Sequence, residues 1–108
     1  MIHEMRLDDK WYKLIKSGKK TVEGRVNDEK RKLIEIGEEI KFINRDNQNN
    51  FIMKDLKNKK LFPNFDKAIR HAKIKNILPD SFRTYKEAVE FYESFPGYKN
   101  KQVVLFYF

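Results

Sequence analysis

Cysteine is absent from this chain of 108 residues, which excludes disulfide bonds and zinc sites built on cysteine. Glycine, proline and histidine are also scarce, with four, three and two residues respectively. No apolar run is long enough to span a membrane, and acid and base both occur within the first six residues, so we expect no signal peptide. These absences favour a protein of a reducing compartment, and we expect a cytoplasmic location.

Hydrophobic and aromatic residues, by contrast, are plentiful. They make up 40% and 14% of the chain, a composition typical of a globular protein rather than a disordered one. A chain of this length has room for one hydrophobic core. We therefore expect a single domain over residues 1–108.

The net charge of +8 favours a polyanionic partner, most often a nucleic acid. Much of this charge falls within residues 54–75, which hold eight Lys or Arg against two acids. A lysine-rich chain also accumulates such charge on solvated faces, so the alternative is that this run is an ordinary solvent-exposed surface without a partner. The candidates for a basic surface are Lys57, Lys59, Lys60, Lys67, Arg70 and Lys73.

Hydrophobic periodicity and turn residues predict an α+β fold. Asn64 and Thr84 are the expected N-caps of two of the helices. Strands joined mostly by short turns suit a small, partly closed β-barrel of five to six strands decorated by about three helices. The predicted strands cover residues 2–7, 21–26, 39–44, 51–62 and 102–108, with an irregularity near 58–60; the predicted helices cover 10–17, 65–72 and 85–94, with a helical turn at 29–33.

The stretch "SGKKTVEGR", residues 17–25, carries the densest polar pattern in the chain. It is not a phosphate-binding P-loop, because Lys13 stands where that loop needs its first glycine. Strand alternation puts Thr21, Glu23 and Arg25 on one face, where the carboxylate can fix the guanidinium as a donor fork for a phosphate or a base edge. Gly24 indicates a bulge or a close approach. The alternative is a charged edge strand protected against aggregation.

The spacing Gly18-x-Lys20-x-x-Glu23-x-Arg25 resembles the G-x-K-x-x-E-x-R signature of the ASCH domain, a member of the PUA-like superfamily. Further segments are similar to ASCH segments in the same order, over nearly the whole chain. The resemblance implies a β-barrel with a cleft lined by Lys20, Glu23 and Arg25, and a role in RNA binding or, in some members, hydrolysis. The further segments are "NDEKRKLIEIGEEIKFIN", "FDKAIRHA", "NILPDSF", "YKEAVEFYESFPGY" and "VVLFYF".

Two enzymatic readings follow from this resemblance, and neither needs a metal or a cofactor. The acetylcytidine amidohydrolases of the family use a Lys, a Thr and a Glu, but Glu23 stands where their nucleophilic Thr lies, and Thr21 is displaced by two residues. The other reading is RNA cleavage, in which Lys20 and Glu23 would be the catalytic groups and Tyr98 would assist. We treat catalysis as the alternative.

The leading interpretation is an RNA- or nucleotide-binding domain, and a protein-interaction module is the lesser alternative. Beyond the signature residues, Asn44, Ser81 and Arg83 are candidate ligand contacts, although Asn44 also suits a turn. Trp11 has the helical spacing of a core residue and is a further candidate for stacking on a base. We expect no metal site, no cofactor and no membrane partner.

Overall fold

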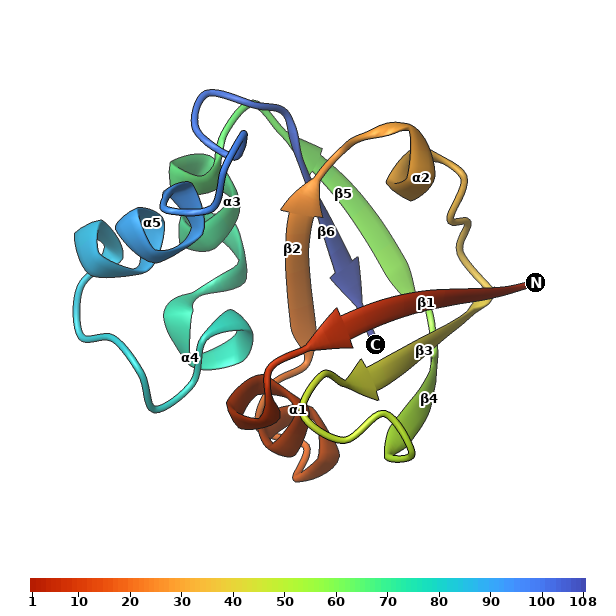
Figure 1. Ribbon diagram of the computed structural model, residues 1–108. Coiled ribbons are helices and arrows are strands. Elements are labelled where there is room, and N and C mark those ends of the chain that lie inside the picture. The colour runs from red at the N-terminus through yellow and green to blue at the C-terminus, as the bar shows by residue number, and fades with distance from the viewer.

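The computed structural model describes all 108 residues as an α+β fold of six strands and five helices (Figure 1). Two of the helices, α2 and α4, are single turns of four residues. None of the five is long and apolar enough to cross a lipid bilayer. The elements are β1 (Ile2–Leu7), α1 (Asp9–Lys16), β2 (Val22–Val26), α2 (Glu29–Lys32), β3 (Glu39–Asn44), β4 (Phe51–Asp55), β5 (Asn58–Phe62), α3 (Phe65–Ala72), α4 (Ile74–Ile77), α5 (Tyr85–Glu93) and β6 (Val103–Tyr107).

Local sequence signals account for the starts of the longer C-terminal helices, and both predicted N-caps are confirmed. The side chain of Asn64 accepts a hydrogen bond from the amide of Lys67 at the start of α3. Thr84 and Glu87 form a reciprocal capping box at the start of α5. Each bond satisfies a backbone amide that has no partner within its own helix.

The predicted barrel is wrong, because the six strands form two separate three-stranded sheets. One sheet has the order β1-β3-β4, with β1 parallel to β3; the other has the order β2-β6-β5 and is antiparallel throughout. The edge strands of each sheet, β1 and β4 in one and β2 and β5 in the other, do not pair with each other, so neither sheet closes on itself. The two sheets lie at a steep angle to each other, as Figure 1 shows.

The predicted single strand over residues 51–62 is also wrong, because the chain changes sheet in its middle. The amide of Leu56 donates to the carbonyl of Glu38, beside β3, whereas the amide of Lys57 donates to the carbonyl of Tyr107 on β6. Two neighbouring amides therefore bond to different sheets. The switch lies just before the expected irregularity at residues 58–60.

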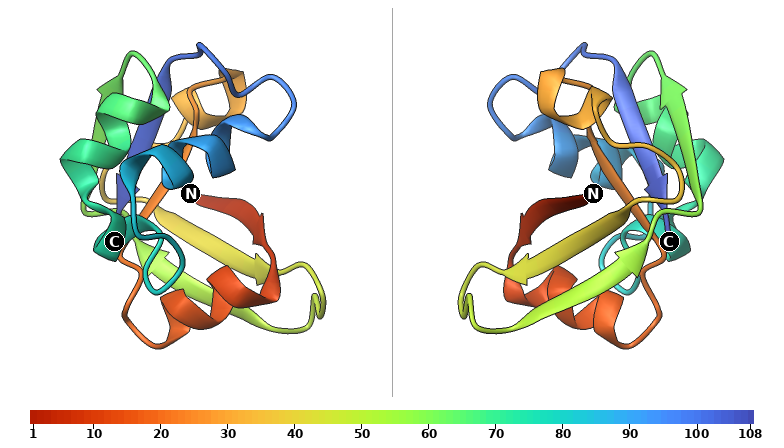
Figure 2. Two further views of the ribbon diagram at one scale, coloured as in Figure 1. Left: turned by 90° about the vertical axis from the view of Figure 1, so that its left-hand side faces the viewer. Right: turned by 90° about the vertical axis from the view of Figure 1, so that its right-hand side faces the viewer.

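The helices flank the two sheets at different places. Helices α3, α4 and α5 gather on one side of the β2-β6-β5 sheet, away from β1 and β3 (Figure 1). Helix α1 lies at one end of the molecule and α2 at the opposite end, both in Figure 1 and in the two views of Figure 2. The cleft described below lies where β1, α1, β2 and α5 come together.

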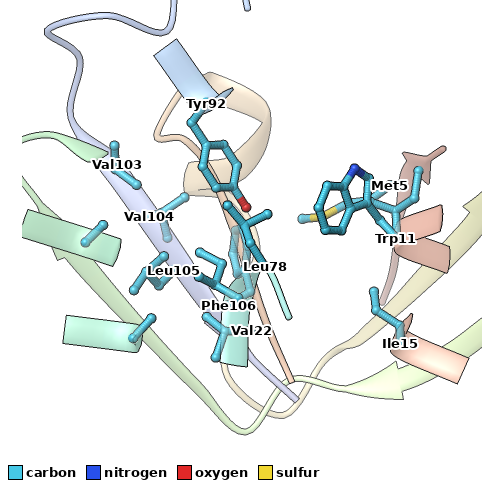
Figure 3. Packing of buried hydrophobic residues seen from close by; sticks show 14 of the residues in the cluster. Met5, Trp11, Ile15, Val22, Leu78, Tyr92, Val103, Val104, Leu105 and Phe106 are labelled. Carbon is cyan, nitrogen blue, oxygen red and sulfur yellow. The ribbon is translucent and has the colours of Figure 1, made fainter. Parts of the chain in front are cut away.

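The core is built around β6, which is the central strand of its sheet, as its apolar sequence predicts. Val103, Val104, Leu105 and Phe106 are all fully buried. Figure 3 shows this strand packed beneath Tyr92 of α5, whose hydroxyl points toward Leu78, while Trp11 and Met5 face it from across the core.

Candidate functional site

A single cleft opens on the surface, with a cavity volume of about 120 Å³. Its walls come from the end of β1, from α1, from β2 and the turn before it, and from α5 and the loop that follows. Lys20, Glu23 and Arg25 all line it, and the neighbouring Gly24 does so too. The signature residues therefore meet around one hollow.

Glu23 is the hub of this cleft and is almost completely buried. Its Oε1 accepts hydrogen bonds from the Gly24 amide at 2.9 Å and from the Tyr92 hydroxyl at 3.0 Å, and lies 3.4 Å from Lys20 Nζ. Its Oε2 lies 3.4 Å from Arg25 Nη2. Burial alone would raise the pKa of Glu23, but the two cations and two hydrogen bonds outweigh it and hold the pKa below its ordinary value. The side chain is therefore an ionised acceptor.

Lys20 lies at the bottom of the cleft, with 2% of its surface exposed. Its ammonium group donates to the carbonyls of Val22, at 2.7 Å, and of Ile77, and it faces Glu23. Burial lowers the pKa of Lys20, although the Glu23 carboxylate opposes this effect. An ammonium group has three protons to donate, and here three acceptors surround it, so Lys20 is fully engaged by the protein.

Arg25 reaches into the cleft with part of its donor fork unused. Nη2 donates to the carbonyl of Arg6 at 3.2 Å and faces Glu23, whereas Nε and Nη1 donate to no protein group. Burial alone would lower the pKa of Arg25, but the Glu23 carboxylate outweighs it and holds the pKa above its usual range. The guanidinium is therefore charged, oriented and available to a ligand.

Gly24 allows the helices to approach β2 closely, as the sequence predicts. A Cβ atom built on it would lie 3.3 Å from both Ile77 Cδ1 and Leu105 Cδ2 and 3.6 Å from a Phe65 ring carbon. The alternative of solvated charges on an edge strand does not fit, because Lys20 and Glu23 are buried although β2 is an edge strand. The glycine lets helices cover β2, and that cover buries the charged side chains.

Aromatic rings form part of the wall of the cleft. Trp11 of α1 lies 5.3 Å from Phe91 of α5, and Phe91 lies 5.4 Å from Phe95, measured between ring centroids. Tyr98 follows at 5.5 Å from Phe95. Phe95 is 40% exposed although it belongs to this row of rings. The planes of successive rings are tilted by 55°, 86° and 49°, so the wall is apolar but not flat, and a planar ligand can stack on one ring at a time.

Two further arginines stand at the mouth of the cleft. Arg6 lies one residue before the end of β1 and Arg45 follows β3, and both are exposed. Arg45 pairs with Asp8 at 3.1 Å, a solvent-exposed ion pair that contributes little to stability. With Lys20 and Arg25 the lining carries four cations against the two acids Asp8 and Glu23. The cleft is therefore net positive and suits a ligand with an anionic part.

The other candidate residues lie apart from this cleft, with the exception of Tyr98, which lines it. Thr21 is exposed, and its carbonyl accepts from the Phe108 amide. Asn44 is buried and holds a turn, accepting from the amides of Asp46 and Asn47. The Ser81 hydroxyl donates to the carbonyl of Pro79, two residues earlier, and Arg83 is exposed on the loop before α5.

The basic residues predicted from the run 54–75 also lie outside the cleft, on β5, on α3 and beside them. Lys59 stabilises the fold and is not a free surface cation. Its Nζ donates to the carbonyls of Arg31, Lys32 and Ile34 at the end of α2. Lys57, Lys67 and Lys73 are exposed, Lys60 lies 3.2 Å from His71, and Arg70 pairs with Asp66.

Several residues of the cleft could not be predicted from the sequence. Tyr92 stands 69 positions after its partner Glu23, and nothing local marks it as different from a core tyrosine. Arg6 and Arg45 are single cations in polar surroundings, and their meeting depends on the pairing of β1 with β3. No group of three or more His, Asp or Glu is placed to hold a metal ion.

Comparison with known proteins supports the fold and gives the family. The crystal structure of hypothetical protein PH0355 is similar, with a TM-score of 0.86 and 31% identity over 99% of this chain and 96% of that one. The solution NMR structure of protein PF0455 from Pyrococcus furiosus has a TM-score of 0.73 and 27% identity over 99% of this chain and 94% of that one. No curated protein matches the chain. The ASCH domain profile matches residues 5–107, and the chain therefore belongs to the ASCH domain family.

Proposed function

We propose that the cleft binds one nucleotide unit, either free or as part of an RNA strand, with the base inside and the phosphate at the mouth. The observation that carries this proposal is the composition of the walls. A guanidinium fixed by a carboxylate, Arg25 on Glu23, faces the interior beside a row of aromatic rings. The exposed cations Arg6 and Arg45 stand at the opening.

The orientation of the ligand follows from the cost of removing charge from water. A phosphate carried into the buried interior would lose most of its hydration, whereas a base is planar and neutral and stacks on rings. The exposed Arg6 and Arg45 can hold the phosphate while it stays hydrated. The Arg25 fork is then left for the polar edge of the base.

Binding has more support than hydrolysis. A general base works best with a pKa near the operating pH, and the pKa of Glu23 is shifted the other way, below its ordinary value. The protons of Lys20 are all engaged by protein acceptors, and the Thr21 side chain lies outside the cleft. Glu23 and Lys20 are therefore arranged to maintain the geometry of the cleft rather than to transfer a proton.

The single tryptophan gives a direct test, because Trp11 lines the cleft and its fluorescence reports on the occupant. Nucleoside 5′-monophosphates and short single-stranded RNA are titrated into the protein at low salt. We expect saturable quenching, and Arg25→Ala weakens the affinity about tenfold or more, since it removes charge-assisted hydrogen bonds.

Lys86→Ala serves as the matched control, because Lys86 is an exposed cation on α5 away from the cleft. It removes the same charge from the molecule and leaves the cleft intact. Equal loss of affinity in Arg25→Ala and Lys86→Ala contradicts the proposal, since binding would then depend on overall charge. Absence of binding by every nucleotide and RNA also contradicts it.

A further inference from the structure

Phe95, in the loop that follows α5, leaves an aromatic ring uncovered at the edge of the cleft. Only two aromatic side chains of the chain are exposed, Phe51 on β4 and Phe95, at 50% and 40%. The Lys41 ammonium lies 4.3 Å from the centroid of the Phe51 ring, whereas no cation lies over the Phe95 ring. Phe95 also lines the cleft. An exposed residue that lines a cleft lies at its rim, so the uncovered part of the Phe95 ring borders the mouth.

The orientation of Phe95 separates it from the rings deeper in the wall. Its plane makes an angle of 86° with that of Phe91 and of 49° with that of Tyr98. Phe65, by contrast, stacks nearly parallel with Tyr92 and with Tyr98, at 9° and 7° between the planes. No protein ring stacks in this way on Phe95. A planar group that stacks on Phe91 cannot stack on Phe95 as well, so the ring of Phe95 is a separate stacking surface.

The charges at the mouth lead a strand toward this ring. Arg6 and Arg45 are exposed there, and the proposed function assigns them the phosphate of the nucleotide in the cleft. In an RNA strand the phosphate joins each nucleotide to its neighbour. A phosphate at the mouth therefore places the neighbouring nucleotide outside the cleft, at the rim where Phe95 is exposed.

The spacing of the rings suits two neighbouring bases. Steps of 5.3 Å and 5.4 Å between ring centroids lead from Trp11 through Phe91 to Phe95. Proteins that bind single-stranded nucleic acid combine cations for the backbone with aromatic side chains on which successive bases stack. Bases of one single strand can be splayed apart, so one base can lie at the inner rings and the next at Phe95.

We propose that Phe95 is the stacking platform for a second base, and that the cleft and its rim together bind a dinucleotide segment of single-stranded RNA. The first base enters the cleft, the linking phosphate lies at Arg6 and Arg45, and the neighbouring base stacks on Phe95. This inference rests on the proposed function, because it needs the first base inside the cleft. It narrows the ligand from a free nucleotide to a strand, since only a strand carries a second base to Phe95.

The test measures how much a second nucleotide adds to the affinity. Adenosine 5′-monophosphate and the 5′-phosphorylated dinucleotide of adenosine are titrated into wild type and Phe95→Ala, with Trp11 fluorescence as the readout. The dinucleotide should bind the wild type more tightly. The ratio of the two affinities should fall about fivefold or more in Phe95→Ala, which is the low end of the contribution of one stacked base. The ratio isolates the second base, because damage to the cleft itself would weaken both ligands equally.

Two further variants separate stacking from other effects. Phe51→Ala is the matched control, since Phe51 is the other exposed phenylalanine and lies outside the cleft, and it should keep the wild-type ratio. Phe95→Leu keeps an apolar side chain but removes the flat ring, so the ratio should fall as it does in Phe95→Ala.

An unchanged ratio in Phe95→Ala overturns the inference, as does a dinucleotide that binds the wild type no more tightly than the monophosphate. Both results leave nucleotide binding in place. A ratio that falls equally in Phe51→Ala also overturns it, because the loss would then not belong to the rim of the cleft, and so does a wild-type ratio in Phe95→Leu. If neither ligand binds, the proposed function fails, and this inference falls with it.

Discussion

At the scale of single residues, Glu23 joins parts of the chain that lie far apart in the sequence. Its two oxygens contact Lys20 before β2, Arg25 within β2 and Tyr92 on α5. A buried ion pair is weak evidence for stability, because the cost of desolvation offsets the Coulomb attraction. What these contacts provide is orientation, since a carboxylate with partners on both oxygens holds the Arg25 guanidinium in one place.

Removal of the Tyr92 hydroxyl is the smallest change that tests the hydrogen-bond network around Glu23. Tyr92→Phe removes one hydrogen bond to a charged acceptor and should lower the free energy of unfolding by about 1.5 kcal/mol. The ring itself remains stacked on Phe65, at 4.6 Å between centroids. Urea unfolding followed by circular dichroism measures the change.

Tyr12→Phe is the matched control, because Tyr12 is as buried as Tyr92, at 5% exposed each, and its hydroxyl bonds to no protein group. It should change stability by a few tenths of a kcal/mol. Equal effects of the two substitutions would show that the bond to Glu23 contributes nothing beyond a generic tyrosine hydroxyl.

The pH dependence of stability gives a second prediction for Glu23. Its pKa in the folded protein lies below the ordinary value of 4.5, so its ionised form contributes stability at neutral pH. That contribution is fully present above pH 4.5 and is lost as the pH falls toward the folded-state pKa. Glu23→Gln has no such group, so the stability gap between wild type and variant should narrow below pH 4.5.

The gap is measured by urea unfolding at intervals between pH 7 and pH 3. Other carboxylates with lowered pKa values, such as Asp28 and Glu38, titrate equally in both proteins and cancel in the difference. A gap that stays constant over this range would mean that Glu23 has the same pKa in the folded and unfolded states.

The signature spacing alone brings Lys20, Glu23 and Arg25 to one place, because they are close in sequence and strand alternation relates two of them. Tyr92 could not be found in this way. Its contact with Glu23 depends on where α5 docks, which is a property of the whole fold. Residues that meet through tertiary packing leave no local trace in one sequence.

At the scale of secondary-structure elements, the meeting of β2 with the helices depends on Gly24. Replacing it by alanine has two opposing effects. Alanine reduces the conformational entropy of the unfolded chain, which stabilises the protein by about 0.4–1 kcal/mol. Its Cβ would lie 3.3 Å from Ile77 Cδ1 and Leu105 Cδ2, and such overpacking costs about 1–3 kcal/mol.

Overpacking should win, so Gly24→Ala is expected to lower the free energy of unfolding by about 1 kcal/mol. The cause can be isolated in an Ile77→Val background, which removes the Cδ1 atom that the new Cβ would meet. There the cost of Gly24→Ala should shrink, and a double-mutant cycle measures the coupling. An identical cost in both backgrounds would show that the contact with Ile77 is not the cause.

The positions of most elements follow from periodicity and capping, which are local. The arrangement of β4 and β5 does not, because the Leu56 and Lys57 amides bond to different sheets. Nothing in the apolar pattern of residues 51–62 distinguishes a bent strand from two strands that belong to separate ladders. The barrel prediction was wrong for the same reason, since closure depends on which edges pair.

At the scale of the whole molecule, the cleft and the basic residues lie at opposite edges of one sheet. The cleft lies at β2, whereas Lys60 is on β5, and β6 lies between these strands. At a strand spacing of about 4.8 Å, the two edges are roughly 10 Å apart along the sheet. None of these basic residues lines the cleft, so a nucleotide held inside it does not need them, whereas an RNA strand of several nucleotides can reach both places.

The two ligands should therefore respond differently when the basic surface is removed. Lys60, Lys67 and Lys73 are changed together to alanine. Binding of single-stranded RNA should weaken, and the slope of log K against log salt should become shallower by about 2, at roughly 0.7 per lost phosphate contact. Affinity for a nucleoside monophosphate should stay unchanged, because none of the three residues lines the cleft.

The control replaces three exposed lysines on other elements, Lys16, Lys30 and Lys86, and so removes the same net charge. Long-range attraction falls equally in both triple variants, so only a local contact separates them. A steeper RNA slope in the control than in the triple variant on β5 and α3 supports an RNA path over that face. Identical slopes in the two variants would show that the basic residues of 54–75 do not contact the RNA. Their charge would then belong to an ordinary solvated surface, and the cleft would be the only point of contact.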